Sequence, residues 1–184
     1  SLTGTGDTVL IGYAAGGAIN STDANGTVAI GREAGTAITS GQRSTLLGYR
    51  AGKQITTAPD NTLVGNQAGM DLTFGKENTF IGSEAGANVT TASGSTAIGY
   101  KAMGSYATTG INNTVVGKGS GQYLITGANN TFLGADIGGT IEGSSNIAIG
   151  QYAMGAIRRE TMESVAIGNS ALAYHGAQCV NIGH

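Results

Sequence analysis

The chain repeats one pattern of apolar and polar positions eleven times. In most repeats a glycine, numbered here as position zero, follows three apolar or β-branched residues and precedes two variable residues and a small-residue pair, usually Ala-Gly. The spacing between these glycines is most often 17 residues. A repeat of this length predicts a solenoid, in which each repeat forms one coil stacked on the next. The glycines are Gly12, Gly31, Gly48, Gly65, Gly82, Gly99, Gly117, Gly134, Gly150, Gly168 and Gly183.

The three residues before each glycine predict a short β-strand. Position −1 is a branched aliphatic residue and position −3 a β-branched residue in every repeat. Such residues favour strands, and the glycine that follows at once is unfavourable within a helix. We therefore expect one strand per coil, ending at the glycine.

Strand alternation divides these positions between two faces. Positions −1 and −3 point to one face and position −2 to the other, and −2 is also apolar until Asn181. A strand that is apolar on both faces is usually covered on both, here by the coil interior and by another subunit. We assign −1 and −3 to the core; the reverse assignment stays open, because the threonines at −3 are less apolar than most core residues. The subunit interface predicted at −2 comprises Leu10, Leu46, Leu63, Phe80, Val115 and Phe132.

The remaining positions predict corners and a return segment. Position −4 is mostly Asn, Ser or Thr, which hydrogen-bond to backbone at corners and can form ladders along a stack. Position +4 is glycine in seven repeats, which predicts a sharp corner, because glycine tolerates the positive φ that such corners need. Position +7 is again apolar, which predicts a second short strand. The expected fold is all-β, a parallel β-solenoid of about eleven ~17-residue coils, with residues 1–184 as a single repeat domain.

Composition narrows the classes of function. Charged residues make up 11% of the chain, against roughly 25% in an ordinary soluble domain. The net charge of −2 gives no electrostatic basis for binding nucleic acid, and no apolar run approaches the ~20 residues that span a bilayer. We therefore expect neither nucleic-acid binding nor membrane insertion. Because the chain begins and ends within repeats, we expect it to be a fragment of a longer fibrous protein.

Few residues suggest chemistry. The acidic residues are scattered over different repeat positions, so we predict no catalytic residue, bound metal or cofactor, and no enzymatic activity. Exposed tyrosines beside polar residues suit stacking against sugars, although an ordinary surface role is the alternative. Candidate receptor or glycan contacts are Tyr13, Tyr49, Tyr100 and Tyr152, with Arg158 and Arg159 from the densest charge cluster.

Two versions of the repeat resemble known fibrous proteins. Residues 164–171, Ser-Val-Ala-Ile-Gly-Asn-Ser-Ala, resemble the head repeat of trimeric autotransporter adhesins of the YadA type. Residues 78–86, Asn-Thr-Phe-Ile-Gly-Ser-Glu-Ala-Gly, resemble related repeats in bacteriophage tail fibres. The resemblance implies a left-handed parallel β-roll, three chains side by side, and a role in adhesion or host recognition. The usual repeat is longer here than in the adhesin heads, which favours the phage fibre.

The expected function is therefore a structural or adhesive segment of a trimeric tail fibre on a virion. Its expected partners are two further copies of itself and a host cell-surface glycan or protein. The alternative within the same class is the head of a bacterial trimeric autotransporter adhesin, exposed on the cell surface.

Two alternatives come from other classes. An ice-binding solenoid would use the threonines at −3, spaced by ~4.8 Å near a lattice repeat of ice, although our assignment points that column inward. A polysaccharide-cleaving solenoid would need a carboxylate pair, for which Asp136 and Glu142 are the obvious candidates.

Overall fold

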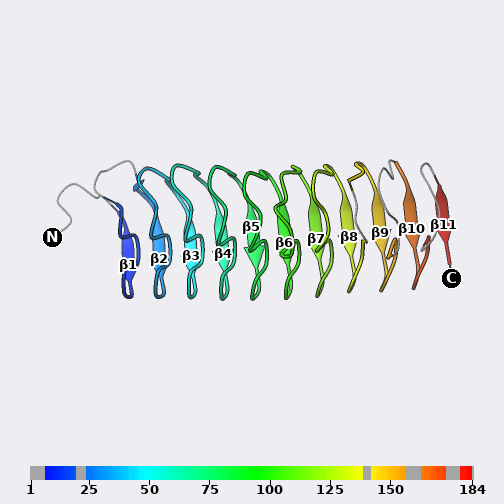
Figure 1. The fold of residues 1–184 in the computed structure, drawn as a ribbon, viewed down its shortest axis with the longest axis horizontal. Coiled ribbons are helices and arrows are strands. Elements are labelled where there is room, and N and C mark those ends of the chain that lie inside the picture. The colour runs from blue at the N-terminus through cyan, green and yellow to red at the C-terminus, as the bar shows by residue number, and fades with distance from the viewer. Residues whose placement is uncertain (1–6, 20–23, 139–141, 156–162, 173–178, 184) are drawn as a thin grey trace.

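The computed structural model describes residues 7–19, 24–138, 142–155, 163–172 and 179–183. Eleven strands lie side by side in chain order and form one parallel sheet along a rod, with β1 and β11 at opposite ends (Figure 1). The strands are β1 (Val9–Ile11), β2 (Val28–Ile30), β3 (Thr45–Leu47), β4 (Thr62–Val64), β5 (Thr79–Ile81), β6 (Thr96–Ile98), β7 (Thr114–Val116), β8 (Thr131–Leu133), β9 (Ile147–Ile149), β10 (Val165–Ile167) and β11 (Val180–Ile182).

The strands pair in phase with the sequence repeat. Leu63 of β4 pairs with Phe80 of β5, and the same −2 to −2 register joins every neighbouring pair of strands. The predicted all-β parallel solenoid is thus confirmed. Ten steps of ~4.8 Å make the sheet about 48 Å long.

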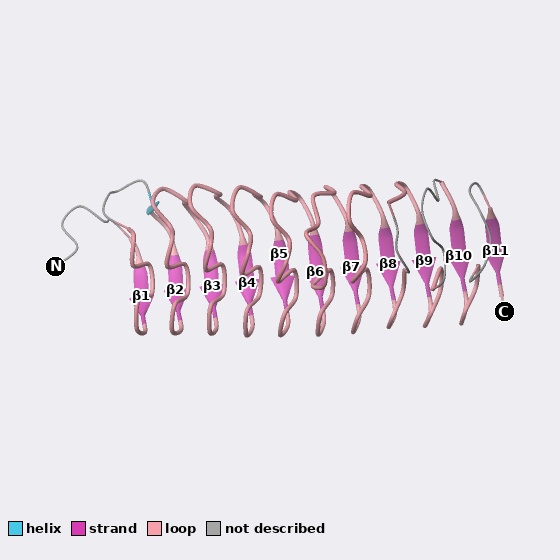
Figure 2. Cartoon of the chain, in the orientation of Figure 1, coloured by secondary structure: helices cyan, strands magenta, loops and turns pink. Residues whose placement is uncertain are grey.

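The second strand predicted at position +7 is wrong within the described residues. Ile38 and Ile55 occupy this position and are fully buried, but they lie at the end of turns rather than in strands. The Ile38 N–H donates to the Gly35 carbonyl at 3.1 Å, which bends the chain, and single bonds such as Ala37 N–H to the Lys53 carbonyl link neighbouring coils here. Turns and loops therefore complete each coil around the one sheet (Figure 2).

The assignment of the two strand faces was wrong, and the reverse alternative is correct. The −2 residues Leu46, Leu63, Phe80, Val115 and Phe132 have no exposed surface, and Leu10 packs against the same core. They belong to one buried cluster with alanines at +3 and aliphatic residues at +7, such as Ala51 and Ile55, so the interior of the coil already covers them. These six residues cannot be the subunit interface, and positions −1 and −3 point outward instead.

The sizes of the side chains at positions −2 and +4 are complementary in most coils, which keeps the volume of the core similar along the rod. Where −2 is large, +4 is glycine, as in Phe80 with Gly86, where an added Cβ would strike the phenyl ring. Of the four repeats with alanine at −2, three carry a buried large residue at +4 in place of glycine, and the fourth combines Ala29 with Gly35. The three pairs are Ala97 with Met103, Ala148 with Met154, and Ala166 with Leu172.

This complementarity predicts a rescue by double substitution. Ala97→Leu alone should overpack the core against Met103 and cost about 1–3 kcal/mol of unfolding free energy. Adding Met103→Gly should recover most of that loss, because it recreates the Leu63 and Gly69 combination found in another coil. Urea denaturation of both single variants and the double variant measures the coupling, and strictly additive effects would contradict the complementarity.

Buried asparagines at position −4 form a ladder beside the core. The Asn130 N–H and side-chain amide donate to Asn113 Oδ1 at 2.9 and 3.1 Å, and the amide also donates to the Gly143 carbonyl at 3.0 Å. Asn130 Oδ1 in turn accepts from the Asn146 N–H at 3.0 Å. Serine takes the same place in Ser95, whose Oγ accepts from the Asn113 N–H at 3.2 Å. The ladder satisfies backbone groups at the corner and fixes the register of neighbouring coils.

Asn130→Ala should lower the unfolding free energy by about 3–5 kcal/mol, since it orphans several buried polar groups at roughly 1–3 kcal/mol each. Asn130→Ser should cost about half as much, because its hydroxyl can still accept from the Asn146 N–H. Denaturant midpoints compare the two variants. Equal losses would mean that side-chain volume, rather than the ladder, matters at this position.

Candidate functional site: the outward sheet face and the turn edge

The outward sheet face consists of positions −3 and −1 of the eleven strands, called here the outward columns. The aliphatic side chain at −1 is at least partly exposed in every strand, for example Ile81 at 38% and Leu133 at 50%. No position in either column carries a charge, and position −1 is aliphatic throughout. An uncharged surface of this length, built from aliphatic residues and threonines, is typical of a face that another molecule covers.

The threonines of the sheet also lie on this outward face. Six consecutive strands, β3 to β8, begin with threonine at −3, and the residues are half-buried or exposed. Their in-phase pairing sets one threonine per coil at a regular spacing of ~4.8 Å. The threonine column therefore faces away from the core, which removes the reason given above against ice binding. The column is Thr45, Thr62, Thr79, Thr96, Thr114 and Thr131.

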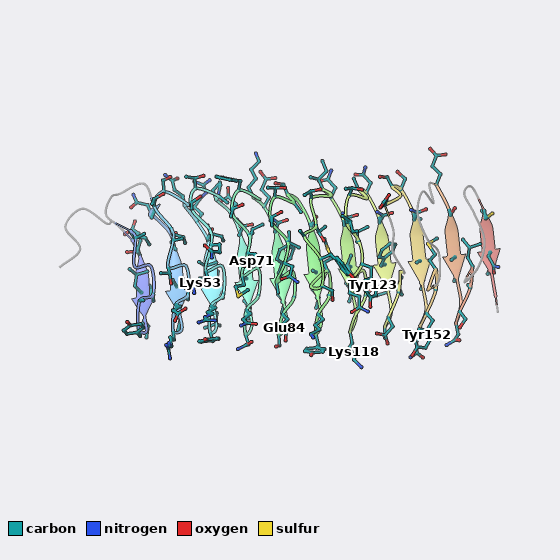
Figure 3. All side chains as sticks on the ribbon, viewed as in Figure 1. Lys53, Asp71, Glu84, Lys118, Tyr123 and Tyr152 are labelled. Carbon is teal, nitrogen blue, oxygen red and sulfur yellow. The ribbon has the colours of Figure 1, made fainter. Side chains whose placement is uncertain are left out.

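The return segment, defined here as positions +5 and +6 after the glycine, carries polar or charged side chains in several of the described coils. Lys53, Asp71 and Tyr123 lie on it, over the middle of the rod and away from the tips of the turns (Figure 3). Each of these side chains is at least partly exposed. Polar and charged side chains are usual on a surface that faces water. The protein therefore has one uncharged broad face, while the segments outside the sheet are mixed, since Phe74, Tyr106 and Ile111 are also exposed there.

The turn edge, defined as positions +1 and +2 of the coils, forms one narrow side of the rod. Glu84, Lys118 and Tyr152 mark it at the tips of the turns (Figure 3). Backbone bonds continue from coil to coil around this edge; for instance, the Arg50 N–H donates to the Arg32 carbonyl at 2.9 Å. Side chains on successive turns are therefore held in the same register as the strands.

One carboxylate on the turn edge is surrounded by three cations. Glu33 lies 2.9 Å from Arg50 Nε, 2.9 Å from Lys53 Nζ and 3.4 Å from Arg32 Nε. The hydrogen bonds from Lys53 and Arg50 lower the pKa of Glu33 to about 2. Glu33 is therefore ionised across the physiological pH range, and Arg32, Glu33, Arg50 and Lys53 are called here the cationic cluster.

The tyrosines predicted as ligand contacts lie on this same edge. The Arg32 guanidinium lies 5.7 Å from the Tyr13 ring centroid, and the Arg50 guanidinium lies 4.8 Å from that of Tyr49. Three of the four, Tyr13, Tyr49 and Tyr100, occupy position +1, and Tyr152 occupies +2. The structure thus brings the tyrosines onto one edge. Arg158 and Arg159 lie outside the described residues.

A smaller group, in which one cation lies between a tyrosine ring and a carboxylate, lies further along the edge. The Lys101 ammonium is 5.3 Å from the Tyr100 ring centroid and 3.4 Å from Glu84. A hydrogen bond with Tyr100 and the charge of Glu84 raise the pKa of Lys101. The edge therefore combines aromatic rings with cations at two places.

Sequence reasoning missed the cationic cluster. Lys53 comes from position +5 of its own coil and reaches the glutamate of the preceding coil, 20 residues earlier in the chain. The available signal was the fixed 17-residue offset between Glu33 and Arg50, which places opposite charges on neighbouring turns.

The obvious enzyme candidates lie in different parts of their coil. Asp136 is on the turn edge, whereas Glu142 lies in the segment that leads to β9. Among the described residues, no group of three or more His, Cys, Asp or Glu side chains could hold a metal ion. A search of the same residues finds no helix long and apolar enough to cross a membrane.

No protein-family model matches the chain, and neither a curated protein nor a solved structure shows significant similarity to it.

Proposed function

We propose that this chain is a structural and adhesive segment of a homotrimeric phage tail fibre that takes part in attachment to the host surface. The observation that carries the proposal is the exposed, uncharged aliphatic face that follows the sheet from β1 to β11. A face of this kind favours burial over exposure to water by about 25 cal/mol per Å² of apolar surface.

The occupant that best fits the outward columns is another copy of the chain. The columns repeat at each coil over the full length of the sheet, and the partner must match this period and this apolar chemistry. The outward columns of a second, parallel copy have the same period and the same apolar chemistry, so they match those of the first copy at every coil. Three copies around a common axis, each a left-handed β-roll, form the assembly that the resemblance to fibre and adhesin repeats implies.

Sedimentation equilibrium of the purified chain tests this proposal. We expect a stable species with three times the monomer mass of 18.2 kDa at micromolar concentration. A stable monomer would contradict the assembly, and a dimer would contradict its three-fold form. The sequence of the flanking gene distinguishes the phage fibre from the bacterial adhesin head, which would carry a coiled-coil stalk and a membrane anchor.

Ice binding is a second candidate, because the structure turns the threonine column outward. Each threonine of β3 to β8 shares its face with the aliphatic residue two positions later, as in Thr79 and Ile81. This face would bind ice only if it stayed uncovered in solution, so the two functions exclude one another. Thermal hysteresis that is lost in Thr79→Lys would support ice binding, and its absence in the parent protein would remove it.

A further inference from the structure

The cationic cluster concentrates positive charge in a protein that is negative overall. Three cations surround the one carboxylate of Glu33, so the cluster carries a net charge of +2 in a chain of net charge −2. The Arg32 side chain is 63% exposed despite its contact with Glu33. One carboxylate cannot neutralise three cations, and the cluster can therefore attract a second anion.

The donors needed to bind that anion remain in place. Arg32 and Arg50 both approach Glu33 through Nε, which leaves their terminal Nη groups to donate. Paired guanidinium N–H groups match the two oxygens of a carboxylate and form charge-assisted hydrogen bonds with it. The ladder of backbone bonds around the turn edge holds both side chains on neighbouring turns.

An aromatic ring lies next to these donors. Tyr13 is 75% exposed and occupies the turn before Arg32, at the same position of its coil. A tyrosine ring can stack on the apolar face of a sugar while its hydroxyl forms a hydrogen bond. A ring beside a carboxylate-binding pair of arginines fits a sugar that carries a carboxylate.

We propose that the cationic cluster and Tyr13 form a binding site for an acidic polysaccharide, with a sugar carboxylate on Arg32 and Arg50 and a sugar ring on Tyr13. This inference rests on the proposed role in surface attachment and names the class of ligand. The turn edge lies at the tips of the coils, beyond the strands that carry the outward columns (Figure 3). The site can therefore stay open when the sheet face is covered.

The second group on the turn edge favours a polymer over a single sugar. Tyr100 and Lys101 lie four coils from Arg32, about 19 Å along the edge, and Lys118 lies on the next turn after them. A linear acidic chain that follows the edge would contact both groups. Simultaneous contacts raise the effective affinity well above that of either group alone.

Isothermal titration calorimetry of the full chain with a hyaluronan oligosaccharide, in which every second sugar is a glucuronate, tests the site. We expect binding at low salt and none to a neutral dextran oligosaccharide. The double variant Arg32→Gln with Arg50→Gln should weaken binding by at least ~30-fold, because it removes charge-assisted hydrogen bonds. Tyr13→Ser should weaken it about fivefold through the loss of stacking.

The matched control removes two cations from the opposite side of the coil. Arg43, paired with Asp60 at 2.6 Å, and Lys76 precede the strands rather than following them. Arg43→Gln with Lys76→Gln changes the net charge equally and should leave affinity unchanged. An equal loss in this control, or equal binding of poly-L-glutamate, which lacks sugar rings, would overturn the proposal, as would no binding of hyaluronan. The sedimentation mass of each variant is measured in parallel, so that failure of the site is distinguished from failure of the assembly.

Discussion

Glutamate at two sites of the outward columns, in Ile81→Glu with Leu133→Glu, should convert the assembly to folded monomers. Removing each isoleucine or leucine from the contact lowers the free energy of association by about 1.5–3 kcal/mol per copy, because its apolar surface is no longer buried there. Each carboxylate would also meet its equivalents in the other copies, and an uncompensated buried charge costs several kcal/mol. A loss of association free energy of at least 5 kcal/mol per assembly lowers the association constant by about four orders of magnitude.

The coil itself should survive these changes, because both side chains point away from the core. Sedimentation velocity gives the mass, and circular dichroism checks the fold. The matched control, Gln54→Glu with Tyr123→Glu, places the same charges on the polar return segment and should keep the parent mass. An assembled double variant, or dissociation of the control, would show that the outward columns are not the contact.

Gly48→Ala should have the largest effect on the fold. Gly48 has φ of +137°, a region that is almost confined to glycine, and an added Cβ would strike the Gly65 carbonyl in the next coil. The backbone strain and the displacement of the next coil together should lower the unfolding free energy by on the order of 3–5 kcal/mol.

The effect of Gly48→Ala is measured from the midpoint of urea unfolding. Gly17→Ala is the matched control, because it has no positive φ and its nearest backbone neighbour, the Ala14 carbonyl, lies at 3.4 Å from the added Cβ. It should change stability by less than about 1 kcal/mol. Similar midpoints for both variants would contradict the special role of position zero.

The contrast between positions zero and +4 explains which glycines the repeat can lose. Position +4 has φ near +57°, the left-handed region, in Gly35 and Gly52, and Met103 adopts φ of +51° at the same place. Non-glycine residues enter that region at modest cost, whereas the region near +130° excludes them. Position zero is therefore always glycine, whereas position +4 takes Met or Leu in three of the four repeats with alanine at −2, the exception being Ala29 with Gly35.

Periodicity was sufficient to predict the architecture. Evenly spaced β-branched residues before a glycine fixed the position of each strand, and the repeat length fixed the parallel register, because one coil advances one strand. The second strand could not be predicted in this way. The apolar residue at +7, such as Ile55, looks the same in a strand and in a buried turn.

The direction of the faces was not predictable from alternation alone. Alternation identifies residues that share a face but not which face is inside. Position −1 looked like the core because it is uniformly aliphatic, whereas position −2 varies from Ala97 to Phe80. The side chain at −2 varies in size because a larger or smaller residue at +4 compensates for it inside the core. Comparing these two positions across the repeats would have shown that −2 faces inward.

The turn edge was only partly predictable. The tyrosines were found because they share repeat positions, but the cationic cluster depends on Lys53 reaching across from another position. Such contacts depend on the path of the backbone around the corner, which the repeat length does not specify.

The claim that the outward columns join parallel copies is tested most directly by distances between spin labels. One label is placed at Leu47→Cys on the outward face and, in a second sample, at Gln54→Cys on the return segment, both with Cys179→Ser. Pulsed electron paramagnetic resonance should give a short interchain distance for position 47 and a longer one for position 54. A longer distance from position 47 than from position 54, in an assembled sample, would contradict the account.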